Sequence, residues 1–367
     1  MLLVTNNVLD WSKLEKDTED ICRPIALDMR TVCESTLMLL PNKNDDAEVD
    51  LLVVVAPTVP HSLFLDETYM QRILMNLLSN ALKFTTSGFV LLLVEMEDGK
   101  LTATVKDTGS GIPSSFLPDL FEPFKQATTR GSQRGTGLGM SIIKQLLHRM
   151  NGTIEVDSRH PDTAGIDPED TGSSFTIKLP APPLSSPLGE TSCPGNRPQV
   201  AIFHGTTERA FEGIEMAWEK AEFDVARVRD FSELSGSDWK YIWADVSFLR
   251  MSPQVREKLL TQDEWLVLVP YDTQEALHQV PGLLAARNCM PLQKPLVWHS
   301  FQQRIATANE RKSSNALSRI VRFASKVDIV DAGDNKRPHE YLASKELTIL
   351  LVEDNPVSPY ELSGVPY

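Results

Sequence analysis

The chain has 367 residues and a formal net charge of −14, and a chain of this length is expected to form two or three domains. Its negative charge argues against nucleic acid or an anionic membrane surface as the main partner. No apolar run is long enough to cross a bilayer, and the first residues lack the features of a secretory signal. We therefore expect a cytoplasmic protein with no membrane segment and no nucleic-acid partner.

The cysteines give no sign of a structural metal or a disulfide framework. The four are scattered, at Cys22, Cys33, Cys193 and Cys289. They form no CxxC pair, and no Cys/His cluster has the spacing of zinc ligands. Reduced thiols in an intracellular protein are the simplest interpretation.

Residues 1–20 are predicted to be the end of an amphipathic helix. The stretch LLVTNNVLDWSKLE places its apolar residues on one side of such a helix. An exposed apolar face needs a partner. The helix either packs as part of a homodimer or lacks its first half.

Residues 21–182 alternate between helix-like and strand-like segments. DETYMQRILMNLLSNALKF predicts a long helix with Asp66 as its N-cap. Strands are predicted in the segments VDLLVVVAP, FVLLLVEME, LTATVKD, TIEVDS and SSFTIKLP. Sequential antiparallel strands beside helices indicate a two-layer α/β sandwich.

A second unit is predicted at residues 198–310, after a Pro-, Ser- and Gly-rich linker at 183–197. Five strand-like runs there are QVAIFHG, FDVARVRD, WKYIWADV, WLVLVP and NCMPLQKP. Helical stretches separate several of them, which favours a doubly wound parallel sheet. Residues 311–345 are predicted to be a polar linker, and 346–367 begin with another buried-type strand, LTILLVEDN.

An unusual polar stripe lies on the predicted long helix. Asn76, Asn80 and Lys83 have the i, i+4, i+7 spacing of one helix face, and buried amides cost free energy unless they are paired. An Asn oxygen suits Mg²⁺, and a lysine balances phosphate charge. The stripe therefore predicts the wall of a polar cleft, although two solvated asparagines on an exposed face remain the alternative.

Two glycine-containing segments follow. In DTGSGIP, Asp107 could accept a hydrogen bond from an amine such as that of adenine, and its glycines allow close backbone approach; a plain Asp/Gly turn is the alternative. RGTGLGMS (134–141) opens a helix, where backbone N–H groups favour an anion. Its spacing is GxGxG, which is neither a dinucleotide fingerprint nor a P-loop.

The order NLLSNALKF, DTGSGIP, FEPF and GTGLGMS resembles the N, G1, F and G2 boxes of histidine protein kinases, members of the GHKL superfamily. The resemblance is strong over about 53–182. It implies a Bergerat-type sandwich that binds ATP with Mg²⁺. It further implies that Asn80 holds Mg²⁺, that Asn76 and Lys83 face the phosphates, and that Asp107 binds the adenine amine.

The same resemblance assigns the remaining cofactor-binding residues. Gly109 and Gly111 would shape the adenine pocket, and Thr176 would support its adenine side. Phe121 and Phe124 would anchor a lid, or they are plain core residues. The hinge over the phosphates would lie in the stretch Gly135, Thr136, Gly137, Leu138 and Gly139.

VLDWSKLE resembles the end of a dimerisation and phosphoacceptor hairpin, but no phosphoacceptor-histidine motif occurs in the sequence. The implied acceptor is therefore in trans, on a histidine-bearing hairpin or a phosphotransfer protein.

The second unit resembles a degenerate receiver domain of flavodoxin-like fold. Asp245 stands where a phosphoacceptor aspartate would be, or it is a solvated carboxylate at a strand end. Lys294 matches the phosphoryl-contacting lysine. Phe203, His204 and Gly205 replace the metal-binding acids, which favours a receiver that is not phosphorylated. Glu353 and Asp354 match the acidic pair of a second receiver, and residues 346–367 are expected to be only its truncated start, without an acceptor aspartate or lysine.

These resemblances favour the ATP-binding catalytic core of a hybrid histidine kinase in a phosphorelay. An inactive nucleotide-binding or interaction module, or a truncated gene product, is the alternative. A GHKL ATPase fits less well, because Asn76 stands where those enzymes carry a glutamate, and an amide cannot act as a general base.

Overall fold

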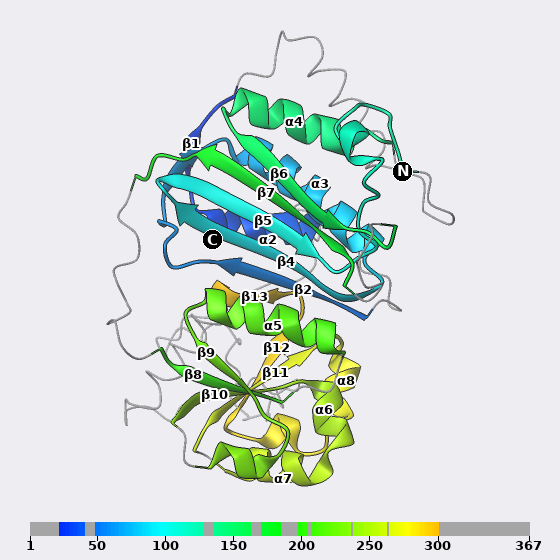
Figure 1. The fold of residues 1–367 in the computed structure, drawn as a ribbon. Coiled ribbons are helices and arrows are strands. Elements are labelled where there is room, and N and C mark those ends of the chain that lie inside the picture. The colour runs from blue at the N-terminus through cyan, green and yellow to red at the C-terminus, as the bar shows by residue number, and fades with distance from the viewer. Residues whose placement is uncertain are drawn as a thin grey trace, which may run out of the picture. The chain divides into compact units, whose positions relative to one another are not determined.

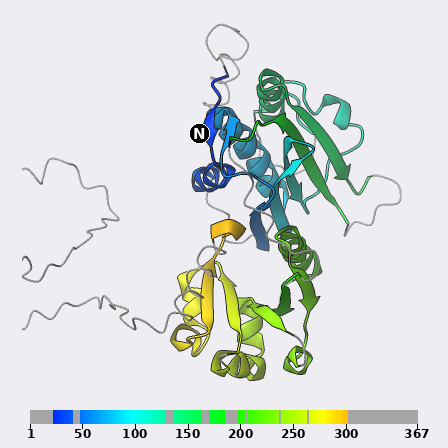
Figure 2. The same cartoon turned by 90° about the vertical axis from the view of Figure 1, so that its left-hand side faces the viewer.

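The computed structural model describes residues 22–40, 48–127, 136–162, 170–184, 197–203, 207–235, 238–262 and 264–300. Its helices and strands are built around a six-stranded and a five-stranded sheet, with a further two-stranded sheet (Figures 1 and 2). The expectations for residues 1–20, for Gly135, and for the acidic pair Glu353 and Asp354 lie outside the described residues. No helix in the described ranges is long and apolar enough to cross a membrane.

The first part of the chain forms five strands of the six-stranded sheet and the helices on one of its faces. Its elements are β1 (Ile25–Leu27), α2 (Met29–Leu39), β2 (Glu48–Val55), β3 (Leu63–Leu65), α3 (Glu67–Phe84), β4 (Ser87–Glu97), β5 (Lys100–Asp107), the 3-10 turn η1 (Leu117–Asp119), α4 (Gly139–Arg149), β6 (Thr153–Arg159) and β7 (Gly172–Pro180). The five strands predicted from the sequence are confirmed as β2, β4, β5, β6 and β7. The two-stranded β1–β3 sheet was not predicted.

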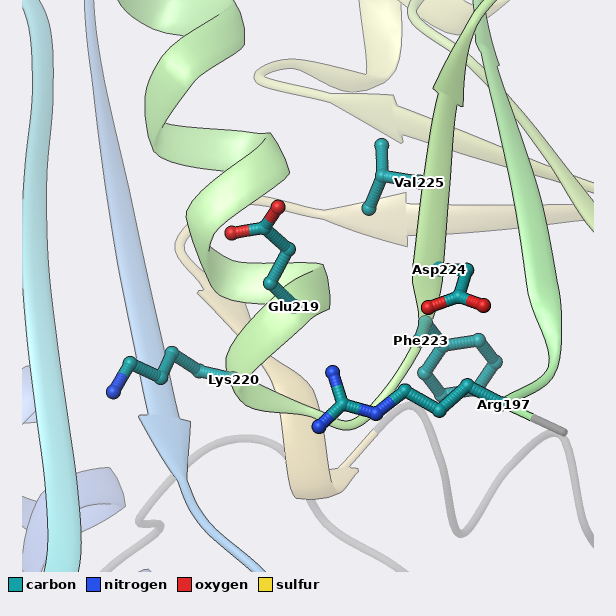
Figure 3. A pocket seen from close by; sticks show the side chains of 6 residues that line it. All are labelled: Arg197, Glu219, Lys220, Phe223, Asp224 and Val225. Atoms are coloured by element: carbon teal, nitrogen blue, oxygen red, sulfur yellow. The ribbon is translucent and has the colours of Figure 1, made fainter. Parts of the chain in front are cut away.

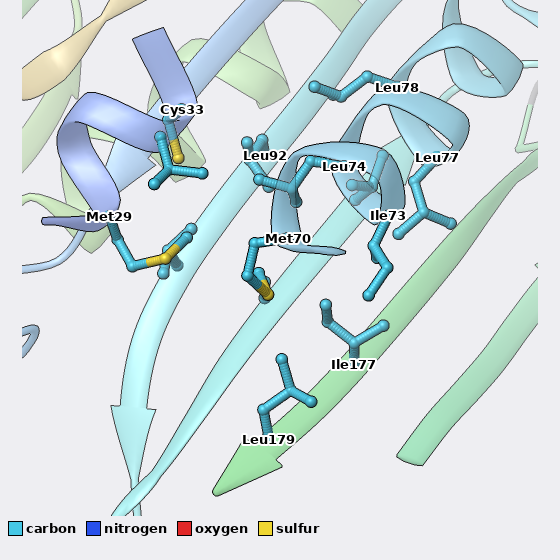
Figure 4. Close-up of a cluster of buried hydrophobic side chains, with 14 of the residues drawn as sticks. Met29, Cys33, Met70, Ile73, Leu74, Leu77, Leu78, Leu92, Ile177 and Leu179 are labelled. Atoms are coloured by element: carbon cyan, nitrogen blue, oxygen red, sulfur yellow. The ribbon is translucent and has the colours of Figure 1, made fainter. Parts of the chain in front are cut away.

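Helix α3 begins where the sequence predicts. Asp66 is its N-cap, and its Oδ1 accepts a hydrogen bond from the backbone N–H of Tyr69 at 2.9 Å. The buried residues recur every three or four positions, at Tyr69, Met70, Ile73, Leu74, Leu77, Leu78 and Ala81. They pack with α2 and the sheet in one apolar core (Figure 4). Each fully buried large side chain contributes about 2 kcal/mol, so this core fixes how α3 lies on the sheet.

The second part forms the five-stranded sheet, in the order β12-β11-β10-β8-β9 with all neighbours parallel. Its elements are β8 (Gln199–Phe203), α5 (Glu208–Lys220), β9 (Asp224–Arg227), η2 (Phe231–Leu234), β10 (Trp239–Ala244), α6 (Val246–Met251), α7 (Pro253–Thr261), β11 (Leu266–Tyr271), α8 (Gln274–His278), η3 (Leu283–Ala285), β12 (Cys289–Gln293) and β13 (Leu296–Val297). All five predicted strands are confirmed. The order is that of a doubly wound, flavodoxin-like sheet.

Strands β2 and β4 are buried on both faces. Alternate residues of β4, such as Val90 and Leu92, face the core with α3, whereas Phe89 and Leu91 belong to a second core with α5. Strand β13 pairs with β2, in parallel, and is thereby the sixth strand of the six-stranded sheet. A strand covered on both faces is a continuous apolar run rather than an alternating one, as FVLLLV is in β4. Helix α5 is thus shared by both sheets.

Candidate nucleotide-binding site

Helix α3 carries the polar stripe on a half-buried face. Asn76 and Asn80 are half-buried and Lys83 is exposed. The Asn76 amide donates to the carbonyl of Arg72 at 2.9 Å, and that of Asn80 contacts the Met140 sulfur at 3.6 Å. Partial burial lowers the pKa of Lys83. Since an amide group also carries an oxygen acceptor, both asparagines retain an oxygen that suits a hard cation or a donor.

The start of α4 lies directly against this stripe. A Cβ placed on Gly139 would lie 3.0 Å from Oδ1 of Asn76, which is tighter than ordinary packing. Helix α4 begins at Gly139, and its N-cap Leu138 makes no side-chain cap hydrogen bond. The first N–H groups of a helix have no partner within it and favour an anion. The structure therefore brings the asparagine stripe and the glycine-rich segment to one place, as the predicted phosphate wall requires.

Gly137 connects this helix start to the phenylalanine segment. Its φ is +71°, and a Cβ there would lie 2.8 Å from the carbonyl oxygen of Lys125. The Gly137 carbonyl accepts from the N–H of Phe124 at 2.9 Å. Phe121 is partly buried against the core, whereas the Phe124 ring is 65% exposed. The core alternative thus fits Phe121 and does not fit Phe124.

Leu138 and Thr136 have separate local roles. Leu138 is fully buried in the core with α3, so it anchors the start of α4. The Thr136 hydroxyl accepts from the Leu138 N–H at 3.4 Å. These contacts hold the described end of the predicted lid in place.

Asp107, at the end of β5, is buried with an exposed fraction of 6%. Its Oδ1 accepts hydrogen bonds from the backbone N–H of Gly109 at 2.8 Å and of Ser173 at 3.3 Å. Burial raises the pKa of Asp107 to about 6, against the opposing effect of these two N–H groups and of Arg209. Both described bonds end on Oδ1, so Oδ2 is the oxygen that remains for a ligand.

The two glycines after Asp107 allow close backbone approach. A Cβ on Gly109 would lie 2.5 Å from the carbonyl oxygen of Phe84. Gly111 has φ +70°, and its Cβ would overlap the carbonyl of Arg159. Side chains at either position would force apart the segments around the end of β5, so the glycines are needed for the shape predicted there.

Thr176 is not brought to Asp107. It lies opposite Thr104 in the β5–β7 pairing, and their hydroxyls are 3.1 Å apart. Its neighbours Phe175 and Ile177 point into the core with α3, so Thr176 lies on the other face of the sheet. Ser173 is the β7 residue that meets Asp107. The alternation Ser173, Phe175, Ile177 already indicates this in the sequence.

In the second part of the chain, the two predicted receiver-site residues, Asp245 and Lys294, have different partners. Asp245 is the N-cap of α6 and accepts from the Phe248 N–H at 2.6 Å and the Ser247 hydroxyl at 2.5 Å. Lys294 forms ion pairs with Asp50 of β2 at 2.6 Å and with Asp272 at 3.3 Å. Burial alone lowers the pKa of Lys294, but these two carboxylates outweigh it and raise the pKa above its usual value.

A surface hollow of about 550 Å³ lies elsewhere, at the end of α5 and the start of β9 (Figure 3). Its lining includes Arg197, Glu219 and Asp224, and none of the predicted nucleotide-binding residues. Within the described ranges, no three His, Cys, Asp or Glu side chains cluster as a metal site. Cys22, Cys33 and Cys289 are free thiols.

Comparison with known proteins identifies the first part of the chain. A family model described as "Histidine kinase-, DNA gyrase B-, and HSP90-like ATPase" matches residues 65–183. The range runs from the start of α3 to the end of β7 and contains every described nucleotide-site residue above.

Two curated relatives extend the comparison. "Hybrid signal transduction histidine kinase A" of Dictyostelium discoideum is 39% identical over 173 residues, 43% of this chain and 8% of that protein. "Sensor histidine kinase GacS" of Pseudomonas protegens is 28% identical over 383 residues, 98% of this chain and 38% of that protein. The chain therefore spans well under half the length of either relative.

A solved structure has the same fold over most of the chain. Full-length ShkA, crystallised in complex with AMPPNP, matches with a TM-score of 0.64 and 23% identity, over 84% of this chain and 62% of that one. The likeness extends beyond the range of the family model. Residues 65–183 therefore form a domain of the histidine kinase-, DNA gyrase B- and HSP90-like ATPase family, and the chain is similar to hybrid and sensor histidine kinases.

Proposed function

We propose that this domain binds ATP with Mg²⁺ and transfers the γ-phosphate to a histidine on a partner chain. The observation that carries the proposal is the meeting of three sequence motifs in the fold. Asn76 lies against Gly139, Asn80 contacts Met140 at the start of the same helix, and Asp107 ends a strand of the sheet beneath them with a buried carboxylate. This arrangement supports a phosphate end beside the start of α4 and an adenine end at Asp107.

At the adenine end, Asp107 would act as the hydrogen-bond acceptor. Two backbone N–H groups fix its Oδ1, so Oδ2 can accept from the exocyclic amine of adenine. Guanine carries a carbonyl oxygen at the corresponding position, and an acceptor facing another acceptor is unfavourable. We therefore expect binding of ATP in preference to GTP.

At the phosphate end, Asn80 would hold Mg²⁺ through its amide oxygen, with phosphate and water oxygens as the other ligands. The bound ion would neutralise phosphate charge. Asn76 and Lys83 would hold the phosphate chain, and the first N–H groups of α4 would donate hydrogen bonds to its oxygens. Phosphoryl transfer depends mainly on positioning and charge neutralisation of this kind. The proposed use of ATP is consistent with the cytoplasmic location expected from the sequence.

The proposal includes the domain organisation of the chain. AMPPNP in the ShkA complex and the names of the relatives support a hybrid kinase with ATP as phosphate donor. We assign residues 21–182 to the ATP-binding domain and 198–310 to a receiver-like domain. The acceptor would be a histidine-bearing hairpin or phosphotransfer protein, and residues 1–20 would take part in a homodimer.

Labelled ATP tests the phosphotransfer. The chain is incubated with γ-labelled ATP, Mg²⁺ and a separate hairpin that carries the acceptor histidine. We expect acid-labile label on the hairpin, and none when its histidine is replaced by glutamine. If saturating ATP gives no transfer to several such hairpins, the kinase proposal is wrong and binding alone remains.

Calorimetric titration tests the metal site. We expect Mg²⁺ to tighten ATP binding at least tenfold relative to EDTA in the wild type. In Asn80→Ala this gain should largely disappear, because the proposed protein ligand is removed. Asn151→Ala, at an exposed asparagine after α4, should retain it. An unchanged metal dependence in Asn80→Ala would show that Mg²⁺ is held elsewhere.

A further inference from the structure

A side chain from the five-stranded part reaches the nucleotide-binding domain beside Asp107. Arg209 lies in the first turn of α5. Its Nη1 donates to the carbonyl of Thr108 at 3.2 Å, and its Nη2 donates to the carbonyl of Thr171. Thr108 directly follows β5 and Thr171 directly precedes β7. One guanidinium therefore joins the ends of two neighbouring strands.

These two carbonyls adjoin the backbone groups that hold Asp107. Gly109 follows Thr108, and Ser173 lies two residues after Thr171; their N–H groups are the donors to Asp107 Oδ1. A planar guanidinium with two fixed donors sets the distance between two acceptors more rigidly than a lysine would. The fork of Arg209 thus fixes both donors around the carboxylate.

The position of Arg209 is not explained by its own helix. A cation in the first turn of a helix opposes the helix dipole and is unfavourable there. The approach of Arg209 to Thr108 also depends on Gly88, whose φ is +102°. A Cβ on Gly88 would overlap the Thr108 side chain and would lie 3.5 Å from the Cβ of Arg209. The packing of α5 on Phe89 of β4 keeps Arg209 in place.

The charges around Asp107 are few. Of the described ionisable groups, Arg209 is the one whose charge acts on this carboxylate; the other influences are burial and the N–H groups of Gly109 and Ser173. Lys106, the preceding residue, points to the opposite face of the sheet, with its ammonium 6.0 Å from the Phe89 ring centre. Arg209 therefore favours the ionised carboxylate, which is the better acceptor.

We propose that Arg209 is a positioning residue of the adenine site, supplied by the receiver-like part of the chain: it holds the carbonyls of Thr108 and Thr171 and thereby orients Asp107 toward the nucleotide. The proposal rests on the function proposed above for Asp107. It makes nucleotide affinity depend on how the receiver-like part is docked.

The test is ATP affinity of the full chain, measured by calorimetry between pH 5 and pH 8. In the wild type, affinity should fall as Asp107 is protonated, with a midpoint near pH 6. Arg209→Met should weaken binding several-fold at pH 7.5. It should also move the midpoint upward, because removal of the positive charge raises the Asp107 pKa further. Arg209→Lys, which retains the charge, should keep the midpoint while losing part of the affinity.

The matched control is Arg227→Met. Arg227 also contacts α5, but its guanidinium forms a bidentate ion pair with Glu208 instead of holding the carbonyls of Thr108 and Thr171. The ATP affinity of Arg227→Met, and the pH midpoint at which this affinity falls, should equal those of the wild type. If Arg209→Met does not fold, Arg209→Gln and Arg209→Lys give the same comparison of uncharged against charged side chains.

The outcomes separate the two proposals. If Asp107→Asn binds ATP as tightly as the wild type, the function proposed for Asp107 is wrong. If Asp107→Asn loses binding while Arg209→Met retains both affinity and midpoint, the role of Arg209 alone is overturned.

Discussion

Asp107 is held in a charged form that its surroundings disfavour. Its folded pKa of about 6 lies above the ordinary value of 3.8 because burial outweighs the two N–H groups and Arg209. A raised carboxyl pKa adds stability only below the ordinary pKa, and this contribution is lost as the pH rises through about 6. At neutral pH the ionised group therefore costs folding free energy, as is common for binding-site residues.

Asp107→Asn should separate stability from binding. The amide oxygen can still accept from Gly109 and Ser173, whereas the new NH₂ group would face the adenine amine, donor against donor. We expect the nucleotide-free protein to be more stable by about 2 kcal/mol at pH 7.5, with the gain shrinking as the pH falls below about 6. ATP affinity should fall at least tenfold.

Thermal unfolding at pH 7.5 and pH 4.5, together with calorimetric titration, checks both effects. Asp157→Asn, at an exposed aspartate in β6, serves as the control and should change neither. A loss of stability in Asp107→Asn at pH 7.5 would contradict the assigned cost of the buried charge.

At the scale of elements, α5 and β4 are packed without room for a single methyl group. Gly213 lies one turn after Arg209, and a Cβ there would overlap the ring of Phe89. Phe89 is 1% exposed and lies in the core shared with α5. The long apolar run of β4 needs this second cover, whereas β6, with its alternating exposed residues, does not.

Gly213→Ala should be destabilising despite the higher helix propensity of alanine. Propensity favours alanine by about 1 kcal/mol, but overpacking in a filled core typically costs about 1 to 3 kcal/mol. We expect the clash to prevail and the melting temperature to fall. In the double variant with Phe89→Leu, part of the loss should be recovered.

A double-mutant cycle from denaturant unfolding measures this coupling. Glu212→Ala, on the exposed side of the same helix, is the control for local helix effects. Additive losses for Gly213→Ala and Phe89→Leu would show that the contact is not formed.

At the scale of the molecule, helix α5 is not the sole link between the two sheets among the described residues. Strand β13 joins the edge of the six-stranded sheet at β2, and Lys294 pairs with Asp50 there. The side chains of Lys294 and Asp50 are only 17% and 9% exposed. Breaking a buried pair leaves one charge uncompensated, which costs far more than the loss of a surface pair.

Lys294→Gln should therefore destabilise both parts of the chain together, by about 3 kcal/mol. Scanning calorimetry should show one transition in the wild type and one at lower temperature in the variant. Asp50→Asn combined with Lys294→Gln should regain most of the loss, because no buried charge is then left unpaired; Asp272, the other partner of Lys294, is 59% exposed and water can solvate it.

Lys220→Gln is the matched control. It removes a pair with Glu95 at 3.0 Å in which Lys220 is 43% exposed, and such pairs contribute less than about 1 kcal/mol. Equal effects of Lys294→Gln and Lys220→Gln would contradict the linking role of the buried pair.

The sequence by itself determined the features that rest on local patterns. The Asp66 cap, the strands and the site stripe depend on residue types at short, fixed spacings, and periodicity reports these directly. The motif order then predicted the family. The alternation of Ser173, Phe175 and Ile177 in the sequence already implies that Thr176 lies on the other face of the sheet from Asp107, so this information was also present in the sequence.

Only the tertiary structure decided which distant groups meet. Arg209 reaches Thr108 across about a hundred residues of sequence, and Lys294 pairs with Asp50 rather than serving only its own sheet. Docking of α5 and the register of β13 bring these groups together, and neither leaves a local pattern. Such contacts arise from complementary packing over the whole chain, which is why the sequence predicted the adenine site but not the arginine behind it.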